Sequence, residues 1–354
     1  MKQKIGFISI GQAGGNIGRL FEQNGYSVIY INTSKEDLNT LSNVKYKYHI
    51  QGGEGCNKDR KKAKQLVISD FDNISKHIYE KLNVELVYVI FSSGGGTGSG
   101  AGPMLIDLLL NDIENDKSCI KYVAAITVLP GLQESVKANM NSYECFSEIL
   151  GINKLSSTFI LDNDKGQKLS INKQFTTMFC DFLNIPTKHI SELGNIDKAE
   201  VMETLSAHGM SIVSVLSDKN SNTAGLLNTF AKNIFAPLED DRVVKYIAIS
   251  QAAEIELTDL KTAIGLTLDD FVTYNKQQTI CVLSGLSFPR KRLDSIYKKI
   301  NDNKQDIMKN LVSVTENTLK DDVNFLDSIS DPTNVKEKTK TETVSRSSIL
   351  SKYL

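Results

Sequence analysis

Short apolar runs alternate with amphipathic stretches along the first half of the chain. The apolar runs predict strands, and the amphipathic stretches between them predict helices. Because these strands are apolar on both faces, we expect a parallel sheet with helices on both sides. The predicted strands span residues 4–10, 27–31, 86–91, 121–129 and 157–162, and the predicted helices about 14–24, 58–82, 101–115 and 132–150.

A nearly apolar helix is predicted over residues 170–185, before Pro186, which should end or kink it. Since it has little polar surface, we expect it to be buried between two units. A smaller α+β unit follows, with predicted strands at 210–216, 243–250 and 279–287. The apolar residues of the helix that recur at three- and four-residue steps are Ile171, Phe175, Met178, Phe179, Phe182 and Leu183.

The end of the chain differs in composition from the rest. A charged helix is predicted from about residue 290 to 326. Residues 335–354 carry five basic and two acidic side chains and are predicted to have no regular structure. They form either a solvated tail or a basic arm for a partner.

Composition and charge narrow the class of protein. The 354 residues exceed the usual size of one hydrophobic core, and a net charge of −1 gives no hint of a nucleic-acid or membrane partner. Five scattered cysteines without a CxxC pair argue against disulfides and zinc sites and for a reducing cytoplasm. No apolar run approaches the ~20 residues of a membrane span, and the start of the chain reads as a strand rather than a signal peptide.

Three glycine-rich loops, at residues 11–18, 51–55 and 91–102, each precede a predicted helix at the carboxyl edge of the sheet. Bare backbone amides and the positive helix end favour phosphate there, and glycine allows a close approach. Three such loops suit a triphosphate better than a pyrophosphate. The P-loop pattern GxxxxGK[ST] is absent, and "GQAGGNIG" does not match GxGxxG.

The stretch "GGGTGSG" (94–100) resembles the signature of the tubulin and FtsZ superfamily, and the resemblance runs from about residue 4 to 285. "GQAGGN", "GGEG", "LPGLQESVK" and "LDNDK" resemble the other nucleotide-binding motifs of this family, in the same order. The resemblance implies binding of GTP and GDP, with Mg²⁺ held by phosphates and water rather than by a protein metal site. The residues it assigns to the nucleotide are Gly11, Gln12, Ala13, Gly14, Asn16, Gly52, Gly53, Gly94, Gly95, Gly96, Thr97, Gly98, Ser99, Glu134 (ribose), Asn163 and Asn172 (guanine).

The segment "GNIDKAEV" (194–201) is similar to the family's NxDxxD motif, with Asn195, Asp197 and Glu200 at matching spacing. Capping of a helix N-terminus is the alternative reading of these residues. The resemblance favours catalysis and implies that the carboxylates enter the nucleotide pocket of the next subunit. The chain would then be a GTP hydrolase activated by head-to-tail self-assembly into filaments.

The end of the chain resembles the plasmid and phage partitioning tubulins. This implies a DNA-bound adaptor that binds residues 335–354, with no nucleic acid bound by the core and no membrane partner. Three alternatives remain open: a division-ring protein of the FtsZ type, a GTP-binding scaffold without turnover, and a nicotinamide dehydrogenase with Glu36 or Asp37 at the ribose.

The resemblance also divides the chain. The expected parts are a GTP-binding domain (1–170), a central helix (171–193), an activation domain (194–289), a C-terminal helix region (290–330) and a flexible basic tail (331–354). The expected fold class is therefore α/β: a parallel-sheet nucleotide-binding domain and a smaller α+β domain joined by the central helix.

Overall fold

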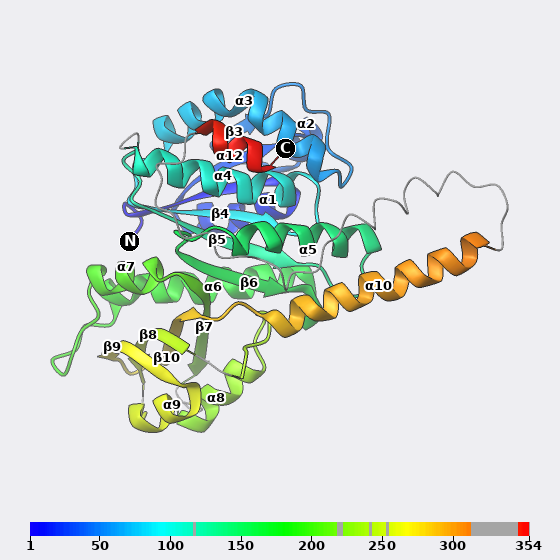
Figure 1. The fold of residues 1–354 in the computed structure, drawn as a ribbon. Coiled ribbons are helices and arrows are strands. Elements are labelled where there is room, and N and C mark those ends of the chain that lie inside the picture. Colours follow the sequence, from blue (N-terminus) through cyan, green and yellow to red (C-terminus); the bar gives the residue numbers. More distant parts are fainter. Residues whose placement is uncertain (116–117, 218–221, 241–242, 253–254, 313–345, 354) are drawn as a thin grey trace.

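A computed structural model describes residues 1–115, 118–217, 222–240, 243–252, 255–312 and 346–353, and a ten-stranded sheet runs through it (Figure 1). The strand order is β3-β2-β1-β4-β5-β6-β7-β10-β8-β9. The strands are β1 (Ile5–Ile10), β2 (Ser27–Asn32), β3 (Tyr46–His49), β4 (Leu86–Ser92), β5 (Tyr122–Leu129), β6 (Ser157–Asp162), β7 (Gly209–Ser217), β8 (Val243–Gln251), β9 (Leu266–Tyr274) and β10 (Gln278–Leu286). The helices are α1 (Gly11–Gln23), α2 (Lys35–Thr40), α3 (Arg60–Lys81), α4 (Thr97–Glu114), α5 (Val136–Leu150), the short η1 (Asn163–Lys165), α6 (Lys168–Lys188), α7 (Lys198–Ser206), α8 (Thr223–Ala231), α9 (Leu257–Ile264), α10 (Arg290–Val312) and α12 (Arg346–Tyr353).

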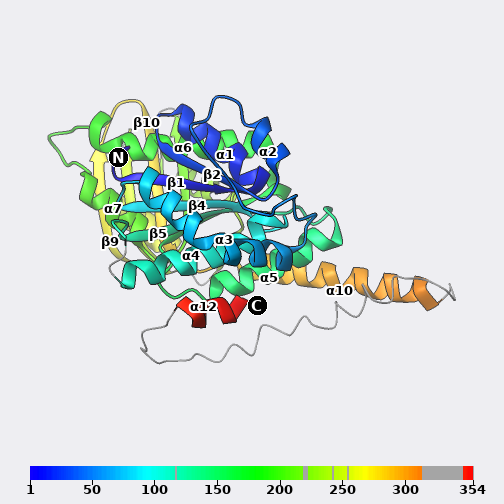
Figure 2. The ribbon, with the colours of Figure 1, turned by 90° about the horizontal axis from the view of Figure 1, so that it is seen from above.

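The first six strands are parallel, and helices cover both of their faces. Helices α3, α4 and α5 lie on one face, and α1 and α6 lie on the other (Figure 2). All six residues of β1 and of β6 are buried, which explains their unbroken apolar sequences. The expected α/β class, with a parallel sheet in the first half of the chain, is confirmed.

The sheet continues into the second half of the chain through a short contact. Strand β7 lies parallel to β6 over three residue pairs, from Ser157↔Gly209 to Phe159↔Ser211. Beyond it, β10 is antiparallel to both β7 and β8, and β9 is parallel to β8. The sequence predicted two units but not a shared sheet. It also missed β3 and β9, because both are partly exposed edge strands without an apolar run.

Helix α6 buries one face, whereas Lys173, Gln174 and Thr177 on the other face are exposed, so the expectation of a helix without an exposed face was wrong. Its side chains Phe175 and Phe179 pack against Phe159 of β6 and Phe21 of α1, with ring centroids 5.0–6.2 Å apart. The helix extends two residues past Pro186, where the sequence predicted an end or a kink. A proline in the last turn removes only one intrahelical hydrogen bond, so the helix can finish its turn.

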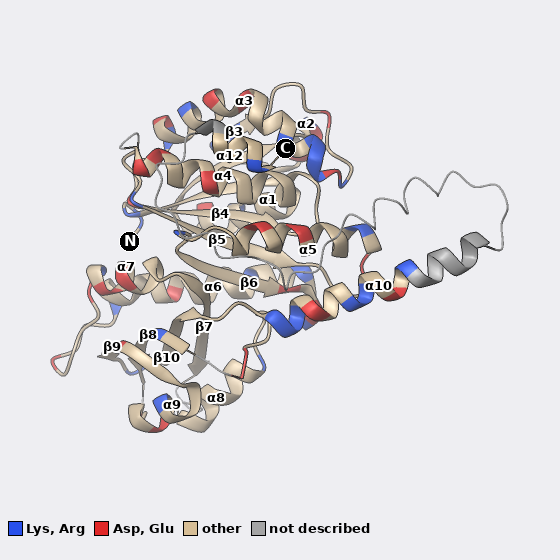
Figure 3. Ribbon diagram, in the orientation of Figure 1, with Lys and Arg blue, Asp and Glu red and all other residues tan. Residues whose placement is uncertain are grey.

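Helix α10 is anchored to the sheet by Arg292, which is 6% exposed. Its guanidinium donates to both carboxylate oxygens of Asp162 (2.7 and 2.9 Å), to Asp164 (2.8 Å) and to the carbonyl oxygen of Pro130 (3.1 Å). From this anchor α10 packs on α5 and then runs away from the body with basic and acidic residues along it (Figure 3). Residues 313–326 of the predicted helix lie outside the described residues.

The last described segment corrects the sequence prediction. Residues Arg346–Tyr353 form helix α12, which both views place against α4 (Figures 1 and 2). The expectation of no regular structure was wrong for these residues. An eight-residue helix is marginal alone in water, so its stability comes from the α4 surface, which a local pattern does not reveal. Residues 335–345 lie outside the described residues.

Candidate nucleotide-binding site

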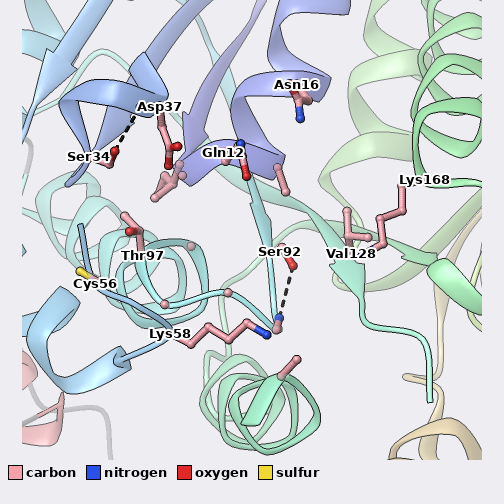
Figure 4. A pocket seen from close by; sticks show the side chains of 18 of the residues that line it. Gln12, Asn16, Ser34, Asp37, Cys56, Lys58, Ser92, Thr97, Val128 and Lys168 are labelled. Atoms are coloured by element: carbon pink, nitrogen blue, oxygen red, sulfur yellow. Dashed lines mark hydrogen bonds between the residues drawn. The ribbon is translucent and has the colours of Figure 1, made fainter. Parts of the chain in front are cut away.

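A cavity of about 610 Å³ lies at the carboxyl edge of the parallel strands (Figure 4). Its volume is in the range of pockets for small ligands and cofactors. The ends of β1, β4 and β5 reach it through Ile10, Ser92 and Val128. The predicted nucleotide-binding residues that line it are Gly11, Gln12, Ala13, Asn16, Gly94, Gly95, Gly96, Thr97, Gly98, Glu134, Asn163 and Asn172.

Two helix N-termini point into this cavity. Helix α1 begins at Gly11 and α4 at Thr97, earlier than the predicted starts at about 14 and 101. No side chain caps either N-terminus, and neither first turn contains an acidic residue. The backbone amides and the positive ends of both helices are thus left for an anion, and two such ends side by side suit a chain of phosphates.

Close packing explains why these turns are built from glycine. A Cβ atom on Gly14 would lie 2.4 Å from the carbonyl oxygen of Ile90, so α1 could not rest on β4. A Cβ on Gly96 would lie 2.8 Å from the Cα of Lys58, so the loop at 55–58 could not approach α4. Glycine therefore sets the shape of the cavity as well as allowing phosphate to approach.

Four of the residues predicted for the nucleotide do not line the cavity. Gly14 faces β4, and the buried Ser99 hydroxyl donates to the carbonyl of Gly95. Gly52 and Gly53 are not in contact with the cavity, and the carbonyl oxygen of Gly53 is 2.8 Å from Nε2 of His49. The next part of the same loop, Gly55, Cys56, Asn57 and Lys58, lines the cavity in their place.

The loop at 55–58 has an unusual backbone held by a buried amide. Asn57 and Lys58 have φ angles of 43° and 59°, a region that non-glycine residues seldom adopt. Asn141 of α5, 4% exposed, donates from Nδ2 to the carbonyls of Lys58 (3.0 Å) and Gly95 (3.0 Å). One side chain thereby joins two loops of the cavity. Sequence reasoning missed Asn141, although a polar residue on the buried face of a helix was a usable signal.

Glu134, Asn163 and Lys168 meet at the other end of the cavity. One carboxylate oxygen of Glu134 accepts from Nδ2 of Asn163 (3.1 Å), from Lys168 (2.9 Å) and from the Gly131 amide (3.1 Å). Burial raises the pKa of Glu134, but the hydrogen bonds from Lys168, Gly131 and Asn163 outweigh it and leave the pKa below its ordinary value. Oδ1 of Asn163 is buried without a hydrogen-bond partner among the described residues. An N–H group of a purine base would satisfy it.

Lys58 is expected to contribute to GTP affinity more than to GDP affinity. Among the described residues that line the cavity, Lys58 and Lys168 are the basic ones, and Lys168 is paired with Glu134. The Lys58 ammonium donates to Oγ of Ser135 at 2.7 Å, so it is the cavity-lining cation that Glu134 does not neutralise (Figure 4). We expect Lys58→Ala to weaken GTP binding about tenfold or more, as for a lost hydrogen bond to a charged group.

Titration of dilute protein with fluorescent GTP and GDP analogues measures both affinities. Lys62→Ala is the matched control, because this exposed lysine in the first turn of α3 does not line the cavity. Equal losses for GTP and GDP would show that Lys58 acts only on the shape of the loop.

The predicted catalytic residues lie far from this cavity, at the start of α7. Oδ1 of Asp197 accepts from the amides of Ala199 (2.7 Å) and Glu200 (2.9 Å), and Glu200 accepts from the amide of Asp197 (2.8 Å). This is a capping box, so the helix-capping alternative describes the isolated chain. Oδ1 of Asn195 accepts from the amide of Ser191 (2.8 Å).

The start of α7 adjoins the amino ends of the parallel strands. Both views place α7 beside the N-terminus of the chain, from which β1 begins (Figures 1 and 2). The cavity adjoins the last residue of β1, Ile10. Six strand residues separate the two ends by roughly 20 Å. Asp197 and Glu200 therefore do not reach the cavity of their own chain.

Comparison with known proteins gives the family. Residues 4–170 match the GTPase domain of the tubulin/FtsZ family. Over 326 residues the chain is 31% identical to the tubulin-like protein TubZ of Clostridium botulinum C phage, covering 90% of this chain and 88% of that protein. The chain belongs to the tubulin/FtsZ family.

Solved structures agree with this family. The crystal structure of Clostridium botulinum phage c-st TubZ, 29% identical, superposes with a TM-score of 0.78 over 86% of this chain and 100% of that chain. A GTPγS-form protofilament of Bacillus thuringiensis serovar israelensis TubZ has a TM-score of 0.72 over 88% of this chain and 94% of that chain, and at 15% identity it shows the fold alone.

The family settles the nucleotide and the class of reaction. The chain is a tubulin-like GTPase, and its nucleotide is GTP or GDP. The nicotinamide alternative was wrong. In the part of the chain that the structure describes, no three His, Cys, Asp or Glu side chains come together as metal ligands. Nor does that part contain a helix that is both long and apolar enough to cross a bilayer.

Proposed function

We propose that this GTPase polymerises head to tail and hydrolyses GTP at the contact between successive subunits. The observation that carries the proposal is the separation of the cavity from Asp197 and Glu200, which lie at opposite ends of the parallel strands (Figure 1). Stacking of copies in one orientation brings the two ends together. In this scheme residues 1–170 bind GTP, residues 171–193 form the central helix, and residues 194–289 carry the activating end.

The surface formed by residues 190–200 has the exposed polar and apolar side chains that a contact with another subunit needs. Asn195 and Asp197 are exposed. Beside them, Ile190 and Leu193 have 77% and 81% of their surfaces exposed, so two apolar side chains are available to a partner next to Asn195 and Asp197. A head-to-tail contact that buries them is heterologous, and it gives an open filament when it does not close into a ring.

The cavity holds the nucleotide for attack by water. The N-termini of α1 and α4 bind the phosphates, and Asn163, Asn172 and Glu134 hold the nucleoside. Asp197 and Glu200 of the next subunit orient the water and accept its proton as it attacks the γ-phosphorus, and the bond to the β-phosphate oxygen breaks. Mg²⁺ would screen the phosphate charges, bound by phosphate oxygens and water, since Asp37 and Glu134 are the acidic residues among the described cavity lining.

The cellular role we propose is DNA segregation in the cytoplasm. The adaptor would be a DNA-bound protein that binds residues 335–354, whose excess of basic side chains suits an acidic surface. A division-ring role is the alternative. Capture of a DNA-binding adaptor by the full chain, and its loss when residues 335–354 are removed, favours segregation.

Electron microscopy of the purified chain with GTP, GDP and a slowly hydrolysed GTP analogue tests polymerisation. We expect filaments with GTP, persistent filaments with the analogue, and none with GDP. Phosphate release per subunit, measured over a dilution series, tests the shared site. It should fall towards zero below the concentration at which filaments form. An unchanged rate in dilute protein would overturn the proposal.

A further inference from the structure

The C-terminal helix α12 is seated on α4 by two residues one turn apart. Ile349 and Tyr353 are each 5% exposed, whereas Ser348 and Ser351 on the other side are exposed. The Tyr353 hydroxyl lies 3.2 Å from Asp107 and 3.4 Å from the carbonyl of Pro103.

Charged groups of α3 and α4 complete the seat. Lys352 donates to Asp107 at 2.9 Å. Nζ of Lys64, on α3, lies 5.2 Å from the centroid of the Tyr353 ring. The surface of α3 and α4 that binds α12, here called the seat, thus buries the side chains of Ile349 and Tyr353. It also places the Asp107 carboxylate against Lys352 and the Lys64 ammonium near the Tyr353 ring.

We expect the contact between α12 and α4 to be reversible. An eight-residue helix does not persist without its partner, so ordering these residues opposes the gain from burying two side chains. The two terms are of the same order, which leaves a small net free energy of docking. The rest of the sheet and its helices do not depend on it, because α12 is the last described element and packs on the outside of α4.

The seat is connected to the phosphate end of the cavity. Lys64 pairs with Glu148 at 2.6 Å, and Glu148 pairs with Arg60 at 2.6 Å. Arg60, 6% exposed, also donates to the carbonyl of Ser99 at 3.1 Å, one residue beyond the cavity-lining Gly98. Each step in this series is a close contact between partly or fully buried groups.

We propose that α4 masks the chain's own C-terminal helix, and that a protein partner binds the tail by displacing α12 from this seat. Such a partner would present an apolar slot for Ile349 and Tyr353 and a carboxylate for Lys352, as α4 does. Because these contacts connect the α12-binding surface of α4 to the glycine loop at 94–98, displacement of α12 changes the affinity for nucleotide. Bound nucleotide changes the equilibrium constant for displacement of α12 by the same factor. The second part rests on the proposed GTP binding; the masking itself does not.

Hydrogen exchange of the full-length chain tests the docking. Tyr353→Ala removes an anchor, and Lys352→Glu places a like charge against Asp107. Both should lower the protection of amides 350–353, which have acceptors within α12, about tenfold or more while leaving α4 protected. Ser351→Ala is the control, because its hydroxyl bonds only within α12, to the carbonyl of Ser348. Unprotected amides in the wild-type chain, or protection unchanged in both variants, would overturn the docking.

A second measurement tests the masking. A labelled peptide of residues 343–354 should bind full-length Tyr353→Ala, whose seat is vacated, at least tenfold more tightly than the wild-type chain. If the peptide binds the wild-type chain and Tyr353→Ala with equal affinity, or binds neither of them, the masking proposal is wrong. Repeating the exchange with GTP and with GDP tests the coupling. Equal protection in the two states, in a chain that binds both nucleotides, refutes the coupling; failure to bind GTP refutes the proposed function and leaves the docking result standing.

Discussion

Glu200→Gln is expected to slow GTP hydrolysis about 10²–10⁴-fold while leaving GTP binding and filament formation intact. Glutamine at this position retains the capping box, in which Glu200 accepts from the Asp197 amide at 2.8 Å, so the start of α7 should keep its structure. What is lost is the negative charge that we propose orients and deprotonates water in the neighbouring cavity. Phosphate release per polymerised subunit measures the rate, and filaments should persist longer after GTP is added.

The structure dictates the choice of substitution and control. Glu200→Ala would also break the cap and could act through the stability of α7, whereas Glu200→Gln separates charge from capping. Glu203→Gln, an exposed carboxylate one turn later on the same helix, should hydrolyse GTP at the wild-type rate. Wild-type turnover by Glu200→Gln filaments would falsify the shared site.

Arg292→Ala is expected to lower the free energy of unfolding by about 3–5 kcal/mol, the usual cost of breaking a buried ion pair. The substitution leaves the Asp162 carboxylate, whose side chain is 2% exposed, without its charged partner. It also detaches α10 from Asp164 and Pro130. Urea unfolding followed by circular dichroism gives the change in free energy.

Two further variants separate charge from geometry. Arg292→Lys keeps the charge but not the two-pronged contact with Asp162, so an intermediate loss is expected. Arg290→Ala removes an exposed arginine two residues earlier and should cost under about 0.5 kcal/mol. If Arg292→Ala costs no more than Arg290→Ala, then Arg292 does not anchor α10.

The sequence predicted the parallel part of the sheet because strands buried on both faces leave unbroken apolar runs. It missed β9, where Asp269 and Asp270 interrupt the run, because an edge strand tolerates polar residues. It placed the start of α4 four residues late, because glycines in the first turn read as a loop. Helix α12 was missed for a different reason: its stability lies in Asp107, Pro103 and Lys64, which are remote in sequence.

The sequence predicted the parts of the candidate site that are formed by backbone amides. It did not predict the parts that are formed by side chains from elements distant in sequence. The glycine motifs indicated that α1 and α4 begin at the site, although both helices begin three to four residues earlier than predicted. They gave no indication of Asn141, which joins two loops from a third element, or of Lys58, whose backbone conformation brings it into the cavity wall. The capping by Asp197 was predicted as an alternative, and its proposed catalytic use needs a second subunit that one chain does not contain.

The narrow join between β6 and β7 has a consequence for communication along a filament. Strand β6 is joined to the second half of the chain by three residue pairs with β7, by a bridge from Leu161 to Phe235, and by the backbone hydrogen bonds on either side of that bridge, whereas seven pairs join β7 to β10. In the filament we propose, a neighbour that contacts Ile190 and Leu193 would press on the half of the molecule beyond this join. Strand β6 ends beside Asn163, which lines the cavity and which we propose contacts guanine, so a movement at this join would reach that residue first. Addition of a subunit would thus alter the contact between Asn163 and the GTP bound in the preceding subunit before that GTP is hydrolysed.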